Sequence, residues 1–168
     1  MAQVCVTRLR ELDRAVLDEL LADFGLVLHV VADDVPIPGS YWGESEAGII
    51  ANGVYVRLDT PLHSLFHEAC HAIVMGEQRR AALVRDAGGD FDEENAVCYL
   101  QILLADEVPG YGRDAMYRDM DAWGYTFRLG SARAWFESDA QQARSALVSA
   151  GLVEEAPALR AVRPERCQ

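Results

Sequence analysis

The sequence predicts an α+β domain in which an N-terminal helix and a small antiparallel or mixed sheet are followed by several helices. Three observations support this fold class: an apolar period of three to four residues near the N-terminus, short β-branched runs around turn residues, and further stretches of helical periodicity. With 168 residues, of which 51% are hydrophobic, the chain is large enough for one core and too short for two. We therefore expect one domain over residues 1–153. Residues 154–168 contain two prolines and no periodicity and should form a flexible tail.

The first helix is predicted from apolar residues that recur at helical spacing between Val4 and Phe24, with Gly25 as its C-terminal cap. Residues 26–31 are apolar and β-branched and should form a strand. Two further strands, 48–51 and 54–57, flank the dipeptide Asn52-Gly53, which is typical of a type I′ hairpin. The hairpin either completes the core or offers an edge to an extended substrate.

The next helix should begin with Thr60 as N-cap and Pro61 in the first turn, and run to about Met75 before Gly76. A later helix should start at Asp90 or Asp92 and reach Ala105. Two more helices are expected, over residues 113–123 and 131–150.

Composition excludes some functions. The formal net charge of −12 repels phosphate backbones and anionic lipid surfaces, so we expect neither nucleic acid nor a membrane as partner. The N-terminus lacks the apolar stretch of a signal peptide, which favours a cytoplasmic location. Four cysteines without CxxC spacing are expected to be reduced thiols.

The motif His67-Glu68-Ala69-Cys70-His71 is the strongest functional signal. Four-residue spacing on a helix brings the two imidazoles onto one face, where both can bind one ion. Imidazole nitrogens suit Zn²⁺, and a catalytic zinc ion has three protein ligands and one position for water. Glu68, about 100° further around the helix, is placed to act on that water as general base.

The third metal ligand is expected to be Glu93. On the helix that begins near residue 90, Glu93 lies in the middle of the apolar stripe formed by the following residues, and a buried carboxylate is stabilised by a cation. Glu94, about a quarter-turn away, is the alternative. His63 lies one turn before His67, too far from His71 for both to bind one ion, and should lie either behind the metal ligands or at the rim of the site. His29, in a predicted strand, should be a packing residue.

These residues resemble the zincin metallopeptidases of the gluzincin kind, which carry two histidines in HExxH and a glutamate on a later helix. Glu93 begins Glu-Glu-Asn-Ala96, similar to the ExxA pattern of that group. The order of elements over residues 10–105 resembles the compact ImmA/IrrE-like peptidases, although Cys70 replaces a frequent glycine and Asn95 a frequent acid. Residues 66–74 are also similar to the peptidase helix of the FtsH proteases.

The resemblance implies a metallopeptidase that holds one Zn²⁺ ion through His67, His71 and Glu93 and hydrolyses peptide bonds of a protein or peptide substrate. The chemistry of the motif agrees, because Glu68 can take a proton from an attacking water and pass it to the leaving amine. The oxyanion needs a further donor, for which the candidates are His63 and a set of tyrosines, Tyr99, Tyr111, Tyr117 and Tyr125. The alternatives are a non-proteolytic zinc-binding regulatory domain and a hydrolase of non-peptide amides.

Overall fold

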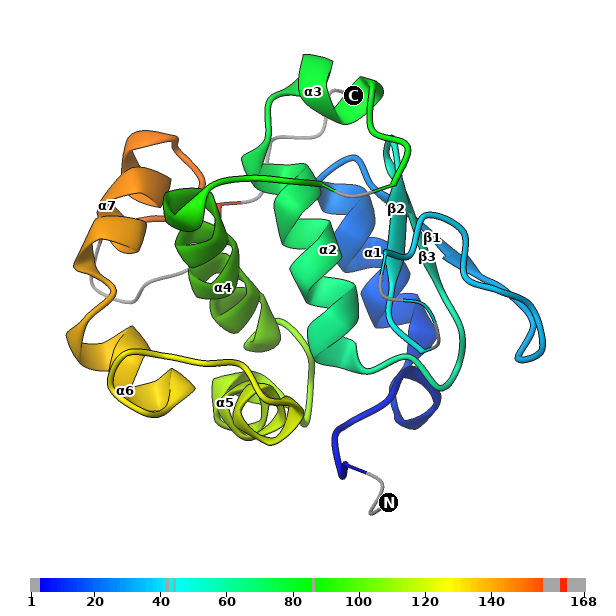
Figure 1. The fold of residues 1–168 in the computed structure, drawn as a ribbon, viewed down its shortest axis with the longest axis horizontal. Coiled ribbons are helices and arrows are strands. Elements are labelled where there is room, and N and C mark those ends of the chain that lie inside the picture. The colour runs from blue at the N-terminus through cyan, green and yellow to red at the C-terminus, as the bar shows by residue number, and fades with distance from the viewer. Residues whose placement is uncertain (1–3, 42, 44, 86, 156–160, 163–168) are drawn as a thin grey trace.

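A small sheet lies at one side of the molecule, and helices pack against it in succession (Figure 1). The computed structural model describes residues 4–41, 43, 45–85, 87–155 and 161–162. Its elements in chain order are η1 (Leu9–Glu11), α1 (Arg14–Asp23), β1 (Val27–Val30), β2 (Gly48–Ile50), β3 (Gly53–Val56), α2 (Leu62–Val74), α3 (Glu77–Ala81), α4 (Phe91–Ala105), α5 (Gly112–Trp123), α6 (Ala132–Ser138) and α7 (Gln141–Ser149). The α+β class and the order of its main elements are as predicted.

The sheet is mixed, with strand order β1-β3-β2. The central strand β3 pairs in parallel with β1 and antiparallel with β2. The inward side chains of the hairpin are apolar: Ile49 of β2 and both Val54 and Val56 of β3 have no exposed surface. The hairpin therefore contributes directly to the core that supports α2.

The edge of the hairpin is not bare. A Cβ added to Gly39 would lie 2.6 Å from O and 2.9 Å from N of Ile49, so the chain around residue 39 packs directly against the backbone of β2. A substrate strand that paired with β2 at this point would have to displace that segment. The packing thus favours a structural role for the hairpin over a role as substrate platform.

The predicted type I′ turn at Asn52-Gly53 is wrong by one residue. Ile50 pairs with Gly53, so the two turn residues are Ala51 and Asn52, and only Ala51 has a positive φ, of 52°. Gly53 lies within β3 for a different reason: a Cβ there would approach the ring of Tyr55 to 2.9 Å and that of His29 to 3.2 Å. This glycine allows close ring packing on the outer face of the sheet, and the left-handed conformation falls on an alanine.

The first helix begins later than predicted. The chain enters in extended conformation, makes the short turn η1, and starts α1 only after Asp13, whose side chain caps the helix by accepting a hydrogen bond from the Ala15 N–H. The apolar period from Val4 onward spans both elements because Leu9 and Leu17 contact the same core. Gly25 follows α1 with a φ of +73°, as expected of a helix-terminating glycine.

Helices α2 and α4 form the centre of the molecule, packed against each other beside the sheet (Figure 1). α2 begins after Pro61, which is its N-cap, whereas the predicted cap Thr60 instead accepts a hydrogen bond from the Arg57 N–H through Oγ1. Asp90 caps α4 by accepting from the Glu93 N–H, as predicted. Every residue of α4 from position 96 to 105 is buried.

The C-terminal helices surround α4. The single helix predicted over residues 131–150 is divided into α6 and α7, because the chain leaves the helical conformation at Asp139, which pairs with the guanidinium of Arg128. After α7 the described part of residues 154–168 is not wholly a loose tail: Ala161 bridges to Val153, and the Val162 N–H donates to the Leu152 carbonyl. The rest of the predicted tail, 156–160 and 163–168, lies outside the described residues.

Within the described ranges, no helix has both the length and the apolar character needed to cross a bilayer. Cys5, Cys70 and Cys98 are free thiols, as predicted, and Cys167 lies outside the described residues.

Candidate metal centre

α2 brings the two motif histidines onto its side that faces α4. His67 and His71 are one turn apart, and their rings meet at 84° with centroids separated by 4.8 Å. Their Nε2 atoms face each other at 3.3 Å. The rest of the helix is anchored by fully buried side chains such as Leu65, Phe66 and Ala69, so the backbone that carries the ring pair is held on its opposite side.

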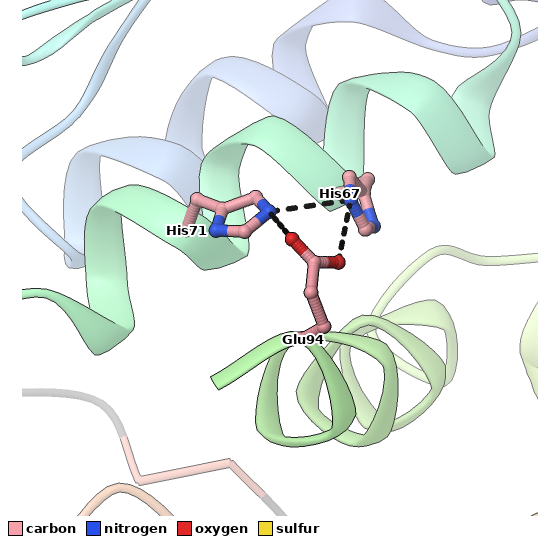
Figure 2. A group of neighbouring side chains, drawn as sticks. All are labelled: His67, His71 and Glu94. Atoms are coloured by element: carbon pink, nitrogen blue, oxygen red, sulfur yellow. Dashed lines mark hydrogen bonds and ion pairs between the residues drawn. The ribbon is translucent and has the colours of Figure 1, made fainter. Parts of the chain in front are cut away.

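Glu94 of α4 completes the group, as Figure 2 shows. Its carboxylate points at the facing nitrogens, with Oε1 3.0 Å from Nε2 of His71 and Oε2 3.5 Å from Nε2 of His67. Each of the three side chains offers an atom within 4.8 Å of the others, and no other set of three such residues meets this condition in the described chain. Two adjacent helices therefore converge on one point.

The spacing of these side chains is compatible with one metal ion held between them. Two ligands at about 2.1 Å from a tetrahedral Zn²⁺ ion lie roughly 3.4 Å apart. The two Nε2 atoms are 3.3 Å apart, and each faces a different oxygen of Glu94, His71 at 3.0 Å from Oε1 and His67 at 3.5 Å from Oε2. Two imidazoles and one carboxylate are also a donor set that catalytic zinc sites use, with the fourth position left for solvent. The residues present thus fit the ion.

Glu93, which the sequence predicts as the third ligand, lies outside this group, and Glu94, the alternative, takes its place. The carboxylate of Glu93 forms two hydrogen bonds with the guanidinium of Arg79, at 2.6 and 2.9 Å, and lies beside Nδ1 of His71, not beside the facing Nε2 atoms. The reason is that α4 is buried around nearly its whole circumference, so its apolar residues do not define one stripe. Arg79, on the unpredicted helix α3, supplies the cation that compensates Glu93.

Glu93 instead lies behind a ligand. The distance from its Oε1 to Nδ1 of His71 is 3.6 Å, longer than a hydrogen bond, and this Nδ1 is buried without a hydrogen-bond partner among the described residues. A carboxylate on the far side of a metal-binding imidazole favours the tautomer whose other nitrogen is free for the metal. Glu93 is well placed to favour that tautomer of His71.

Gln101 holds the other histidine. It is fully buried, and its amide nitrogen donates to the His63 carbonyl at 3.0 Å, so its oxygen is left to accept from Nδ1 of His67 at 3.1 Å. With Nδ1 protonated, Nε2 of His67 presents a lone pair toward Glu94 and His71. Sequence reasoning missed this role, although Glu94 and Gln101 are seven residues, or about two turns, apart and so lie on one face of α4.

The pKa values of the two ring-pair histidines, His67 and His71, are shifted in opposite directions. Burial and the neighbouring His71 lower the pKa of His67. Burial also acts to lower the pKa of His71, but the hydrogen bond with Glu94 and the charges of three nearby glutamates raise it overall. The hydrogen bond with His71 lowers the pKa of Glu94, keeping it ionised. The group is therefore built around a concentration of negative charge that a cation would neutralise.

The group opens into a cleft with a volume of about 750 Å³. Glu68 lines this cleft together with His67, His71 and Glu94, as the motif predicts for a general base that acts beside the ion. The charge of Glu68 is also one of the causes that raise the pKa of His71. The described chain thus brings together the expected base and the two expected histidine ligands.

Of the four candidate tyrosines, Tyr125 is the one that lines the cleft. Its ring lies 5.8 Å from that of His67, and its hydroxyl is 3.2 Å from Nδ1 of His63. Burial raises its pKa well above the usual range, so the hydroxyl keeps its proton. The other candidates face elsewhere: Tyr111 donates to Asp119 at 2.7 Å, and both Tyr99 and Tyr117 pack against the ring of Phe136.

The remaining histidines differ from each other. His63, expected either behind the metal ligands or at the rim, is buried with 1% exposure beneath Tyr125 and Trp123, and its carbonyl accepts from the Gln101 amide that also holds His67. Burial is the main cause that lowers its pKa to about 3, and it is neutral. His29 is exposed on the outer face of the sheet, where it stacks on Tyr55 with ring centroids 4.6 Å apart. It packs as expected but lies far from the core.

Neither a protein-family model, nor a curated protein, nor a solved structure matches this chain.

Proposed function

We propose that this protein is a zinc-dependent metallopeptidase in which His67, His71 and Glu94 hold one Zn²⁺ ion. The observation that carries the proposal is the convergence of two imidazoles from α2 and one carboxylate from α4, with an atom of each within 4.8 Å of the others, beside a fourth residue, Glu68, in the same cleft. A zinc site that only stabilises a fold has four protein ligands and needs no glutamate next to them. This cleft supplies three ligands and a base.

Zinc, when bound, acts as a Lewis acid that polarises a carbonyl and makes water acidic enough to react near neutral pH. The protein supplies the proton transfers. Glu68 accepts a proton from the water while the water oxygen attacks the carbonyl carbon of the peptide bond. Glu68 then gives that proton to the amine as the C–N bond breaks. One carboxylate therefore serves first as base and then as acid.

Tyr125 is suited to stabilise the carbonyl oxygen as it becomes negative. Its hydroxyl lies in the cleft and, because its pKa is raised, is a hydrogen-bond donor at physiological pH. In the tautomer that carries its proton on Nδ1, neutral His63 donates to the Tyr125 oxygen across the 3.2 Å contact, which leaves the hydroxyl proton for the substrate and adds no charge. A fixed donor in a partly buried cleft stabilises developing charge more than the same donor does in water.

The test is a Glu68→Gln substitution, which keeps the size of the side chain and removes its basicity. The unmodified protein loaded with one zinc ion should cleave members of a library of unfolded peptides, and Glu68→Gln should bind zinc equally while losing nearly all turnover. Glu19→Gln is the matched control, because Glu19 is exposed on α1, away from the cleft. Zinc binding without any peptide cleavage by the unmodified protein would overturn the peptidase proposal, and equal turnover by Glu68→Gln would remove the role of this residue.

A further inference from the structure

A second cavity lies beside the metal cleft and has no part in the chemistry described above. Its volume is about 290 Å³, near the lower end of the roughly 300–1,000 Å³ typical of ligand pockets. The cleft and the cavity share four wall residues: Phe91, Asn95, Thr126 and Phe127. The two spaces are therefore neighbours.

The position of the shared wall relates the cavity to the scissile bond. Asn95 follows the proposed ligand Glu94 directly in α4, and Phe91 lies three residues before Glu94, about one helical turn away. An extended peptide advances about 3.3–3.6 Å per residue. A substrate whose carbonyl lies at the metal centre therefore has a side chain from one of its next few residues within reach of the cavity.

Half of the ten residues that line the cavity are apolar, and three of these are aromatic: Phe91, Phe127 and Trp135. Phe127 stacks on Trp135 with ring centroids 5.0 Å apart, and Ala140 and Ala143 leave room in front of them. Phe91 also lines the cavity and is 79% exposed, so its ring buries little surface in the free protein. A large exposed aromatic beside a cleft is the kind of surface that binding would cover.

The polar wall residues carry little free charge. The guanidinium of Arg128 is paired with the carboxylate of Asp139, and the Gln142 amide donates to Asp92 at 3.4 Å. An ammonium or carboxylate group that entered the cavity would lose hydration without meeting an uncompensated opposite charge. A neutral side chain with a large apolar surface has no such cost and gains from covering the rings.

We propose that this cavity binds a large neutral apolar side chain, aromatic or long aliphatic, of the peptide substrate close to the bond that is cleaved. The proposal rests on the peptidase function and adds to it a substrate class: peptides with residues such as phenylalanine, leucine or methionine at one position near the scissile bond. Phe91, Phe127 and Trp135 are then specificity-determining residues.

Two variants change the cavity in opposite ways. Ala143→Phe fills it and should lower kcat/KM for a peptide with phenylalanine at the preferred position by roughly 10- to 100-fold relative to the same peptide with glycine there. Phe91→Ala removes the exposed rim and should weaken the same preference without affecting the fold, because surface positions contribute little to stability. The matched controls are Ala146→Phe, on the exposed side of α7, and Val84→Ala, an exposed apolar residue outside both spaces.

A binding measurement separates failure of this proposal from failure of the peptidase function. The indole N–H signal of Trp135, assigned through a Trp135→Phe variant, should shift when N-acetyl-phenylalanine amide is added and should stay in place with N-acetyl-glycine amide. Ala143→Phe should abolish the shift. Cleavage without preference for large apolar residues, or an unchanged Trp135 signal, would overturn the proposal. Absence of cleavage together with a selective shift would overturn the peptidase function alone and leave the apolar binding site supported.

Discussion

The carboxylate of Glu94 lies 3.0 Å from Nε2 of His71, although the two residues belong to different helices separated by 23 positions in the chain. This contact is possible because α2 and α4 pack against each other over much of their length. The candidate metal centre is thus a product of helix packing, and its geometry depends on the buried contacts that hold the two helices together.

The assignment of Glu94 as ligand predicts an order of zinc affinities. Glu93→Ala should weaken zinc binding by roughly 10- to 100-fold, as loss of an outer carboxylate does. Glu94→Ala should weaken it more, because a direct ligand is lost. Competition with a chromophoric chelator measures both dissociation constants, and a larger loss for Glu93→Ala than for Glu94→Ala would contradict the assignment.

Gln101 predicts a combined effect on stability and on zinc. Gln101→Leu leaves Nδ1 of His67 and the His63 carbonyl without their partner, which should cost about 1–3 kcal/mol in the free energy of unfolding. It should also weaken zinc binding by roughly 10- to 100-fold, because the His67 ring is no longer oriented. Denaturant unfolding and a zinc titration give the two values. If zinc affinity stayed unchanged, Gln101 would be a purely structural residue.

Tyr125 predicts a loss of kcat with zinc retained. Tyr125→Phe removes the donor for the carbonyl oxygen, and kcat should fall by roughly 10²- to 10³-fold, while the zinc dissociation constant changes little. Tyr111→Phe is the control. Its hydroxyl donates to Asp119 outside the cleft, so this variant should lose stability and keep its kcat. Equal kcat values for the two variants would show that Tyr125 does not act on the substrate.

The hairpin turn predicts opposite effects of two small substitutions. Ala51→Gly should stabilise the protein by up to about 1 kcal/mol. The left-handed conformation costs an alanine roughly 1–2 kcal/mol, and the larger loss of backbone entropy that glycine undergoes on folding offsets part of the difference. Gly53→Ala should destabilise it, because the new Cβ would meet the rings of Tyr55 and His29. Thermal unfolding compares the two. If Ala51→Gly did not stabilise the protein, the register that places Ala51 in the left-handed position would be contradicted.

The sequence predicted well what lies within one helix. The spacing of His67 and His71 determines their relative position on α2, and the approximate ends of α2 and α4 follow from Gly76 and Asp90. The third ligand depended on how two helices meet, and periodicity could not decide it because α4 is buried on nearly every side. The pairing of Glu93 with Arg79 was equally hidden, since Arg79 lies on a short helix that the sequence did not predict.

One further feature could have been found from the sequence, and another could not. The seven-residue spacing of Glu94 and Gln101 puts two polar side chains on one face of an otherwise apolar helix, which is a signal for a polar group facing the histidine helix. The position of the hairpin turn, one residue before Asn52-Gly53, could not be found in this way. The dipeptide favours a turn, but the packing of Tyr55 and His29 over Gly53 shifted the register by one residue.

The most direct test of the metal centre is a crystal structure of the zinc-loaded protein with anomalous diffraction data collected at the zinc absorption edge. One strong peak is expected between α2 and α4, at about 2.0–2.2 Å from Nε2 of His67, Nε2 of His71 and a carboxylate oxygen of Glu94. A peak bound to Glu93 in place of Glu94, or a zinc ion located away from the two histidines, would contradict the account.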